Sequence, residues 1–304
     1  MARGSSAAAK PTIGILSAGE MGAALGGILV RQGYRVLTSA AERSERTCRR
    51  AESAGLELTL SVAALAQIAD VVLSVVPPSA AVGVAEQYCG QASPVRNRLF
   101  VDLNAIAPVS VARTDELCRR HGVRFVDGAV HGMAARLPQH GTMYLSGPFA
   151  QEVAALFAPS LRVKILGGPV GQASAFKMMI SGMAKGVVAL FVEMALAARQ
   201  AELLTELLEC YGDAYPGIMA LVERLLPTYP QHAARRGDEL EEVEQTMRAL
   251  GLEPDMVAAA RRTTTALGKI AWVEHAIPQD GSEWSVRTVI EAIYAEHPLN
   301  AIQG

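Results

Sequence analysis

The chain has 304 residues, of which 50% are hydrophobic and 19% are charged. This composition is typical of a soluble globular protein, and it excludes a collagen, a disordered chain and a disulfide-stabilised miniprotein. Because 28 Lys and Arg face 30 Asp and Glu, the net charge is −2, and the sequence offers no basic field for nucleic acid or an anionic membrane.

The N-terminal residues 1–10 are expected to form a disordered tail, since they contain no apolar segment of a targeting signal. The four cysteines are Cys48, Cys89, Cys118 and Cys210. They form no CxxC pair, which favours reduced packing residues in a cytoplasmic protein. The apolar stretch 182–199 includes Lys185 and Glu193, so we expect no membrane span there.

Residues 11–168 alternate short β-branched runs with helical stretches, a rhythm typical of a parallel sheet covered on both faces. Strands are expected at 12–16, 35–39, 56–58, 71–76, 99–103 and 124–126, with 142–145 and 162–166 extending one edge. The spacing of apolar residues predicts a helix over 20–31, with Gly33 as its C-terminal stop. The fold class is therefore α/β, with an N-terminal doubly wound domain of the Rossmann type.

Residues 169–304 show helical patterns only, and an all-α second domain is expected for substrate binding and dimerisation. Its first helix should run from Gln172 to about Leu204, followed by helices at 214–226, 238–250, 255–267 and 283–296. Asp238 and Glu241 have the spacing of a capping box, which places a helix start at Asp238. A first helix of this length usually connects domains or subunits, so we expect a homodimer.

The first strand leads directly into a glycine-rich turn, Ser17-Ala18-Gly19-Glu20-Met21-Gly22, and then into the first helix. This is the context in which a dinucleotide fingerprint has meaning. Gly19 would let the backbone approach a pyrophosphate, and Gly22 would allow close packing of helix on strand. Ser17 replaces the first glycine of the motif, and an ordinary strand-to-helix turn is the alternative interpretation.

The second strand ends at Ser39 without the acidic residue that holds the ribose of NAD. Arg43, with the hydroxyls of Ser44 and Thr47, has the chemistry to hold a 2′-phosphate. We therefore expect NADP in preference to NAD. The alternative is a solvated helix start, with Glu42 available for a ribose.

Four segments in this order resemble the β-hydroxyacid dehydrogenase superfamily, which includes 3-hydroxyisobutyrate and 6-phosphogluconate dehydrogenases. They are Gly14 to Gly22, Val126 to Gly132, Gly141-Thr142, and Gly168 to Gly171 with Lys177. The resemblance spans residues 11–200. The helical remainder, with the run Arg235 to Glu242, is similar to a C-terminal domain found in one branch of that superfamily.

The resemblance implies that Lys177 is the catalytic lysine and that residues 127–132 form the substrate loop. It also places Asn104 near the nicotinamide and substrate, and Val76 and Pro77 on the nicotinamide side. Two positions depart from the family pattern. His131-Gly132-Met133 replaces Ser-Gly-Gly, and Ser181 replaces an asparagine four residues after the lysine.

Hydride transfer between a CH–OH group and a nicotinamide requires a group that takes or gives the hydroxyl proton. Lys177 can do this if burial and a nearby cation lower its pKa. Ser181 and Lys185 follow on the same helix face, and Lys185 is either that cation or a ligand for an anionic group of the substrate. His131 either binds substrate and shares proton transfer, or is a loop histidine bonded to backbone.

The sequence thus predicts an NADP-dependent oxidoreductase that interconverts a β-hydroxy acid, or a related hydroxyl compound, with its carbonyl form. Its small-molecule substrate is expected in the cleft between the two domains. One alternative is an imine reductase acting on C=N, a relative that usually lacks the lysine. A second is a non-catalytic NADP-binding sensor. The histidines show no metal-ligand spacing, so no metal is expected.

Overall fold

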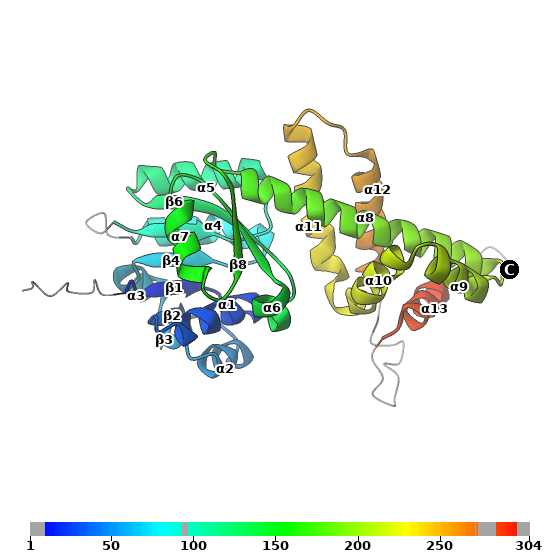
Figure 1. Ribbon diagram of the computed structural model, residues 1–304, viewed down its shortest axis with the longest axis horizontal. Coiled ribbons are helices and arrows are strands. Elements are labelled where there is room, and N and C mark those ends of the chain that lie inside the picture. Colours follow the sequence, from blue (N-terminus) through cyan, green and yellow to red (C-terminus); the bar gives the residue numbers. More distant parts are fainter. Residues whose placement is uncertain (1–9, 93–96, 271, 273–283, 297–304) are drawn as a thin grey trace, which may run out of the picture. The chain divides into compact units, whose positions relative to one another are not determined.

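The computed structural model describes residues 10–92, 97–270, 272 and 284–296. The chain divides into two compact units, Met1–Lys177 and Met178–Gly304, and the long helix α8 (Gln172–Gln200) runs through this division (Figure 1). Of the predicted N-terminal tail, only Lys10 belongs to the described residues.

The first unit is built on one eight-stranded sheet, in the order β3-β2-β1-β4-β5-β6-β7-β8. Its strands are β1 (Ile13–Leu16), β2 (Val36–Ser39), β3 (Glu57–Thr59), β4 (Val71–Ser74), β5 (Leu99–Asp102), β6 (Arg124–His131), β7 (Thr142–Ser146) and β8 (Arg162–Gly167). All neighbours are parallel except β6 and β7. The predicted α/β class is confirmed, although β6 is longer than expected because its second half pairs antiparallel with β7.

Helices cover both faces of this sheet. On one face lie α1 (Glu20–Arg31), α2 (Glu45–Ser53) and α7 (Ala150–Phe157), and on the other α3 (Val62–Ile68), α4 (Ala81–Cys89) and α5 (Pro108–Arg120). A short helix, α6 (Leu137–His140), follows β6. The alternation of strand side chains produces the two layers: Ile13 and Ile15 pack with the first set, and Leu16 with the second. Helix α1 has the predicted bounds, and Gly33 follows it with a φ of 78°.

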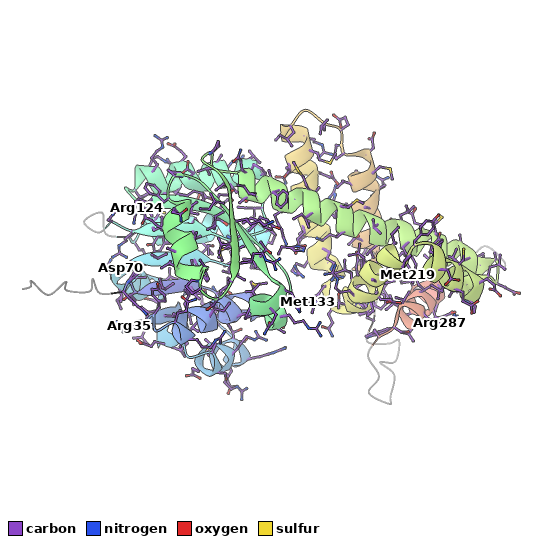
Figure 2. The ribbon with its side chains drawn as sticks, in the orientation of Figure 1. Arg35, Asp70, Arg124, Met133, Met219 and Arg287 are labelled. Carbon is purple, nitrogen blue, oxygen red and sulfur yellow. The ribbon has the colours of Figure 1, made fainter. Side chains whose placement is uncertain are left out.

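The amino and carboxyl ends of the parallel strands lie at opposite ends of the sheet, and only the carboxyl ends are the usual position for a ligand. Arg35, Asp70 and Arg124 lie where β2, β4 and β6 begin, and Met133 lies near the opposite edge, past the end of β6 (Figure 2). Parallel strands β1 to β6 all end at that opposite edge. In open α/β sheets this is the edge at which ligands bind.

The second unit is helical in its described part. After α8 come α9 (Leu204–Ala214), α10 (Pro216–Leu225), α11 (Tyr229–Ala249), α12 (Asp255–Leu267) and α13 (Val286–Glu296). Their apolar faces share one core, to which α8 contributes Val188 and Val192, α10 Val222, and α13 Ile290. The all-α prediction is confirmed.

Two helix boundaries differ from the prediction. Helix α8 ends at Gln200, and a separate helix α9 follows it. Helix α11 begins at Tyr229, so the capping box at Asp238 is wrong, and Asp238 lies in the helix interior. Pro230 is tolerated there because a proline in the first helical turn loses no hydrogen bond. The predicted start of the last helix, at Glu283, lies outside the described residues.

Within the described part of the chain, α8 alone is long and apolar enough to cross a membrane, and 44% of its apolar window is buried inside the protein. Its residues Val188, Phe191 and Val192 pack in the core of the helical unit. Lys185 and Glu193 interrupt the apolar run. These features favour the core helix of a helical unit over a membrane span.

The four cysteines are all free thiols. Cys89 and Cys118 are buried between α4 and α5, with their sulfur atoms 3.6 Å apart, and Cys48 is half-buried. Cys210 is exposed. The expectation that all four are packing residues is therefore wrong for Cys210, because a single cysteine at helical spacing does not reveal which face it occupies.

Candidate active site

The turn between β1 and α1 has the backbone that the dinucleotide motif requires. Ser17 takes a φ of 81°, the left-handed region that glycine normally supplies. A Cβ on Gly22 would stand 2.2 Å from the carbonyl oxygen of Ser17. Only glycine therefore allows the helix to start so close to the strand. The serine keeps the motif's conformation although it changes the motif's sequence.

The space above this turn is open. No atom lies within 4 Å of a Cβ built on Gly19, which is the N-cap of α1. No side chain caps the first turn of α1, and Glu20 points to Arg50, with a carboxylate-to-guanidinium distance of 3.8 Å. Uncapped N–H groups at a helix start bind phosphate well. The buried Ala18 and half-buried Met21 pack beneath the turn, so the residues present fit the pyrophosphate of NAD(P).

The end of β2 leads into the start of α2. Ser39 is buried, and its hydroxyl accepts a hydrogen bond from the backbone N–H of Ala41 at 3.2 Å. Ser44 is the N-cap of α2, and its Oγ accepts from the backbone N–H of Thr47 at 3.3 Å. Arg43 is exposed, and its backbone N–H donates to the carbonyl oxygen of Ala40 at 3.2 Å, whereas its guanidinium forms no hydrogen bond or ion pair with the described residues. Whether these residues hold a 2′-phosphate stays a prediction.

Asn104 joins the loops that follow β4 and β5. Its Oδ1 accepts from the backbone N–H of Val76 at 2.6 Å, and its Nδ2 donates to Ser74 Oγ at 2.9 Å. Strand β4 ends at Ser74, two residues before its predicted end at Val76. Val76 and the exposed Pro77 therefore belong to the loop that follows β4. The structure brings these three predicted residues together, and their contacts with nicotinamide or substrate stay predictions.

Asp102, at the end of β5, is a buried acid that the sequence did not mark out. Its Oδ1 accepts from the backbone N–H of Asn104 at 2.9 Å, whereas Oδ2 has no partner among the described residues. Burial raises the pKa of Asp102 to about 7. Its identity as an acid inside an apolar strand was the available signal, since a carboxyl group rarely occupies such a position without cause.

Asp127, in the middle of β6, fastens the start of α8 to the sheet. Its Oδ2 accepts from Ser146 Oγ at 2.8 Å and from the backbone N–H groups of Gly171, Ala173 and Ser174 at 3.0 to 3.1 Å. Its Oδ1 accepts from Ser174 Oγ at 2.6 Å. The resemblance placed Asp127 at the start of the substrate loop. The structure gives it a positioning role instead, since all five contacts are internal.

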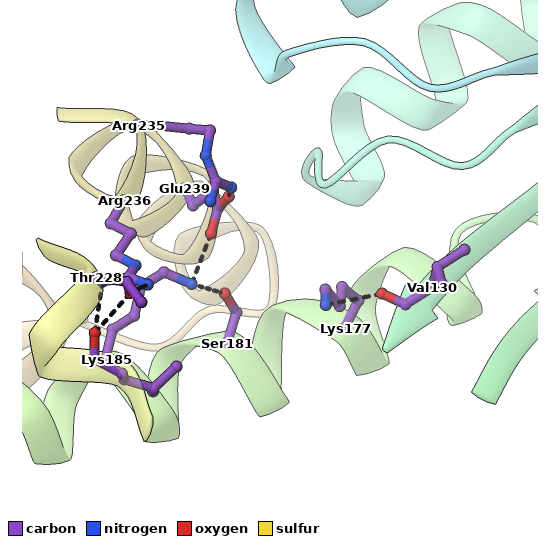
Figure 3. Close-up of polar contacts among 9 residues, drawn as sticks. Val130, Lys177, Ser181, Lys185, Thr228, Arg235, Arg236 and Glu239 are labelled. Carbon is purple, nitrogen blue, oxygen red and sulfur yellow. Dashed lines mark hydrogen bonds and ion pairs between the residues drawn. The ribbon is translucent and has the colours of Figure 1, made fainter. Parts of the chain in front are cut away.

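Lys177 lies on the second turn of α8, and its Nζ donates to the carbonyl oxygen of Val130 at 2.9 Å (Figure 3). The amine therefore reaches the end of β6, next to His131 and Gly132. The predicted bounds of the substrate loop, 127–132, are wrong, because β6 continues through the half-buried His131, which pairs with Thr142 on β7. Of that predicted loop, only Gly132, with a φ of 132°, lies beyond the strand.

The neighbours of Lys177 on α8 are apolar residues with unequal exposure. Ala173 and Met178 are buried, but Phe176 and Met179 are 37% and 56% exposed. The surroundings of Lys177 are therefore apolar and buried on one side of the helix only.

Ser181 and Lys185 lie further along α8, in the helical unit, and both are buried. Lys185 Nζ donates to Ser181 Oγ and forms an ion pair with Glu239 Oε2 at 2.7 Å (Figure 3). Arg235 pairs with the other oxygen of Glu239. Burial lowers the pKa of Lys185, although Glu239 opposes this. Sequence reasoning missed the role of Glu239, because the misplaced start of α11 hid its i,i+4 spacing from Arg235.

Among the described residues, no group of three or more His, Cys, Asp or Glu side chains is arranged to hold a metal ion. An open glycine turn at the first strand, a doubly wound sheet and an amine at the end of β6 together define an NAD(P)-binding protein of the oxidoreductase class.

Two segments of the chain match the models of known protein families. Residues 12–162 match the NAD-binding domain of 6-phosphogluconate dehydrogenase. Residues 198–267 match a domain of unknown function, DUF1932. Both matches agree with the resemblance of this chain to the β-hydroxyacid dehydrogenase superfamily and to its branch with a helical C-terminal domain.

Several known proteins are similar along most of the chain. A solved protein of unknown function, described as structurally similar to 3-hydroxyacid dehydrogenases, is 29% identical and has a TM-score of 0.66, covering 84% of this chain and 96% of its own. An uncharacterised 28.5 kDa protein of Methanothermus fervidus is 26% identical over 82% of this chain and 96% of its own length.

More distant structures share the fold. The 3-hydroxyisobutyrate dehydrogenase of Mycobacterium tuberculosis is 18% identical, with a TM-score of 0.70 over 94% of this chain and 99% of its own. An imine reductase of Myxococcus stipitatus is 17% identical, with a TM-score of 0.58 over 93% of this chain and 99% of its own.

Proposed function

We propose that this protein is an NADP-dependent oxidoreductase that interconverts a β-hydroxy acid, or a related hydroxyl compound, with its carbonyl form, and that Lys177 is its acid/base. One observation carries the proposal: the Nζ of Lys177 is held at the end of β6 by the carbonyl of Val130. This is the same edge of the sheet at which the open turn of Ser17 to Gly22 lies.

The chain's own residues account for binding and for proton transfer. Backbone N–H groups of the turn from Ser17 to Gly22 would bind the pyrophosphate, and Arg43 would pair with the 2′-phosphate. The cofactor, when bound, would supply the nicotinamide that exchanges a hydride with the substrate carbon. In oxidation, the Nζ of Lys177 takes the proton of the substrate hydroxyl as the C–H bond breaks, and in reduction it returns a proton to the carbonyl oxygen.

The test is the substitution Lys177→Ala in a screen of hydroxy acids, sugar acids and their phosphates. Loss of a positioned acid/base should lower kcat by about 10²- to 10⁴-fold, while the Kd for NADPH, measured by fluorescence, stays within about threefold. The control is Lys164→Ala, because Lys164 is an exposed lysine on β8 of the same unit. Unchanged turnover by Lys177→Ala would overturn the acid/base assignment.

The same screen separates this proposal from its rivals. An imine reductase would reduce cyclic imines with NADPH and would tolerate Lys177→Met. A non-catalytic sensor would bind NADPH and exchange hydride with no compound of the panel. The structure favours the dehydrogenase because the lysine that imine reductases usually lack is present and anchored.

We further propose a cytoplasmic homodimer formed through α8. Within the helical unit this helix exposes Met179, Met183, Leu190 and Met194. Their spacing of four, seven and four residues places them on one stripe. A continuous exposed apolar stripe on a long helix is typical of a subunit interface.

A further inference from the structure

We propose that Ser181, Lys185 and Arg235 of the helical unit form a binding site for an anionic oxygen group, a carboxylate or a phosphate. The inference rests on the proposed function, because it assigns to these residues the anionic group of the substrate. Arg235 joins the predicted substrate-binding residues Ser181 and Lys185, and Glu239 pairs with both cations. These side chains would select substrates that carry an anionic group.

The first argument is charge. Lys185, Arg235 and Arg236 stand against one carboxylate, Glu239, which leaves an excess of two positive charges. Lys185 and Glu239 are only 8% and 9% exposed. Among the described residues, no other acid pairs with Lys185 or Arg235. Arg235 is exposed, so one of the two excess charges, from Lys185 and Arg236 against Glu239, is buried. A buried excess of like charge is unfavourable, and an anion bound beside it would relieve the cost.

Arg236 supplies charge, and its guanidinium is held by contacts within the helical unit. Its guanidinium donates to the carbonyl of Leu225 at 3.2 Å and to Thr228 Oγ1 at 2.5 Å, and it lies 4.3 Å from the ring centroid of Tyr229. These contacts fasten α11 to the segment before it. Arg236 therefore contributes a fixed positive charge next to the site, and the ligand would meet other groups.

The second argument is the supply of donors. Ser181 Oγ accepts from Lys185, which leaves the hydroxyl hydrogen of Ser181 free to donate. Lys185 has three N–H bonds and uses two of them, to Ser181 and Glu239. Arg235 uses one of its five N–H groups, and its side chain is 50% exposed. Hydroxyl, ammonium and guanidinium groups are the donors that bind carboxylate and phosphate most strongly.

Glu239 itself shows that the geometry suits an anion. Its two oxygens lie between Lys185 and Arg235, one facing each cation (Figure 3). The pair thus already holds one carboxylate inside the protein. The remaining donors and the excess positive charge are sufficient for a second one, or for a phosphate, which would enter on the exposed side of Arg235.

The first experiment measures binding directly on the full-length protein saturated with NADP, so that the nucleotide site is filled. Inorganic phosphate and malonate are titrated by calorimetry at constant ionic strength, against wild type, Arg235→Gln and Arg224→Gln. Arg224 is an exposed arginine on α10 of the same unit and serves as the control. We expect Arg235→Gln to weaken binding at least tenfold, and Arg224→Gln to leave it unchanged.

The two probes distinguish the two sources of anion. Binding of phosphate alone identifies a phosphate ester as the ligand, and binding of malonate alone identifies a carboxylate. If neither probe binds wild type, or if Arg235→Gln binds both as wild type does, the site is overturned. Lys185→Met provides a second variant, and an unchanged circular dichroism spectrum for Arg235→Gln shows that lost binding is not unfolding.

A second experiment separates this inference from the proposed function. With a substrate found in the screen, Arg235→Gln should raise KM at least tenfold and leave kcat within about threefold. For the methyl ester of that substrate, the substitution should not change KM. Turnover without this KM effect overturns the anion site alone. Anion binding that depends on Arg235, in a protein that turns over no hydroxyl compound, overturns the proposed function and leaves the anion site standing.

Discussion

Replacing Asp127 by asparagine should loosen the first unit and misplace Lys177 without changing the shape of any side chain. Asp127 is completely buried, and its two oxygens accept five hydrogen bonds. Two of the donors, the N–H groups of Ala173 and Ser174, belong to the first turn of α8. The substitution keeps the volume but removes the negative charge opposite a helix start, where it is favourable.

The magnitude follows from the contacts. A hydrogen bond to a charged group contributes about 1.5 to 3 kcal/mol and a neutral one about 0.5 to 1.5 kcal/mol, so each of the five bonds should lose about 1 kcal/mol. The amide also places N–H groups where an oxygen accepted. The neutral amide also avoids the desolvation cost of a buried charge, which makes the loss of stability smaller. We expect a net loss of about 3 kcal/mol in the free energy of opening the first unit, which corresponds to a roughly 150-fold change in its opening equilibrium.

The assay must report on the first unit, and its thiols provide it. Both tryptophans, Trp272 and Trp284, belong to the helical unit, whereas the buried thiols Cys89 and Cys118 belong to the first. In a background of Cys48→Ser and Cys210→Ser, labelling of the two buried thiols under native conditions measures how often the first unit opens. Tryptophan fluorescence in urea measures the helical unit separately.

Asp127→Asn should label roughly 150-fold faster and lower kcat, while the urea transition of the tryptophans stays unchanged. The matched control is Asp115→Asn on α5, because the carboxylate of Asp115 accepts no hydrogen bond from the described residues. A labelling rate within threefold of the control would refute the reasoning, since it would mean that the five contacts contribute nothing beyond those of a neutral amide.

Three further outcomes are expected. Arg43→Ala should weaken NADPH at least tenfold more than NADH, measured by fluorescence titration with Arg46→Ala as control, and an equal loss for both would reject the 2′-phosphate contact. Met183→Glu should halve the mass in solution, whereas Met256→Glu on α12 should not; a wild-type monomer would exclude the dimer. Because burial raises the pKa of Asp102 to about 7, the folded protein holds this proton after the unfolded chain has released it. Between pH 4 and 7 the free energy of unfolding should therefore fall by up to about 4 kcal/mol, and Asp102→Asn should flatten that decline in thiol labelling.

The sequence predicted the first unit well because its signals are local. The bounds of α1 follow from a glycine turn before it and a glycine with positive φ after it, and both act within a few residues. The strands in the middle of the sheet follow from short β-branched runs that are buried on both faces, whereas β3 and β8 at the two sides of the sheet are largely exposed. Such patterns need no knowledge of distant contacts, and all eight expected strands are present.

The errors arose where distant contacts decide. Strand β6 continues past Val126 because β7 pairs with it, and pairing partners cannot be read from one segment. Helix α11 begins at Tyr229, although Asp238 offers the better local cap, because Tyr229 and Ala233 pack in the core of the helical unit. In this case tertiary packing outweighs a capping preference of about 1 kcal/mol. The roles of Asp127 and Glu239 were missed for the same reason.

The position of the Lys177 amine, the proposed acid/base, depends on two sets of contacts between β6 and α8. Asp127, in the middle of β6, accepts hydrogen bonds from the first turn of α8. Three residues further along β6, the carbonyl oxygen of Val130 accepts a hydrogen bond from the Nζ of Lys177. With only one of these contacts, the start of α8 could rotate relative to β6. Ordering the lysine side chain would then cost more rotamer entropy, because its anchor would move. With the helix start fixed first, the side chain has only to span the remaining gap. Asp127, which fixes the start of α8, is therefore as necessary to the position of the amine as the lysine side chain itself, although all five of its hydrogen bonds are to the protein.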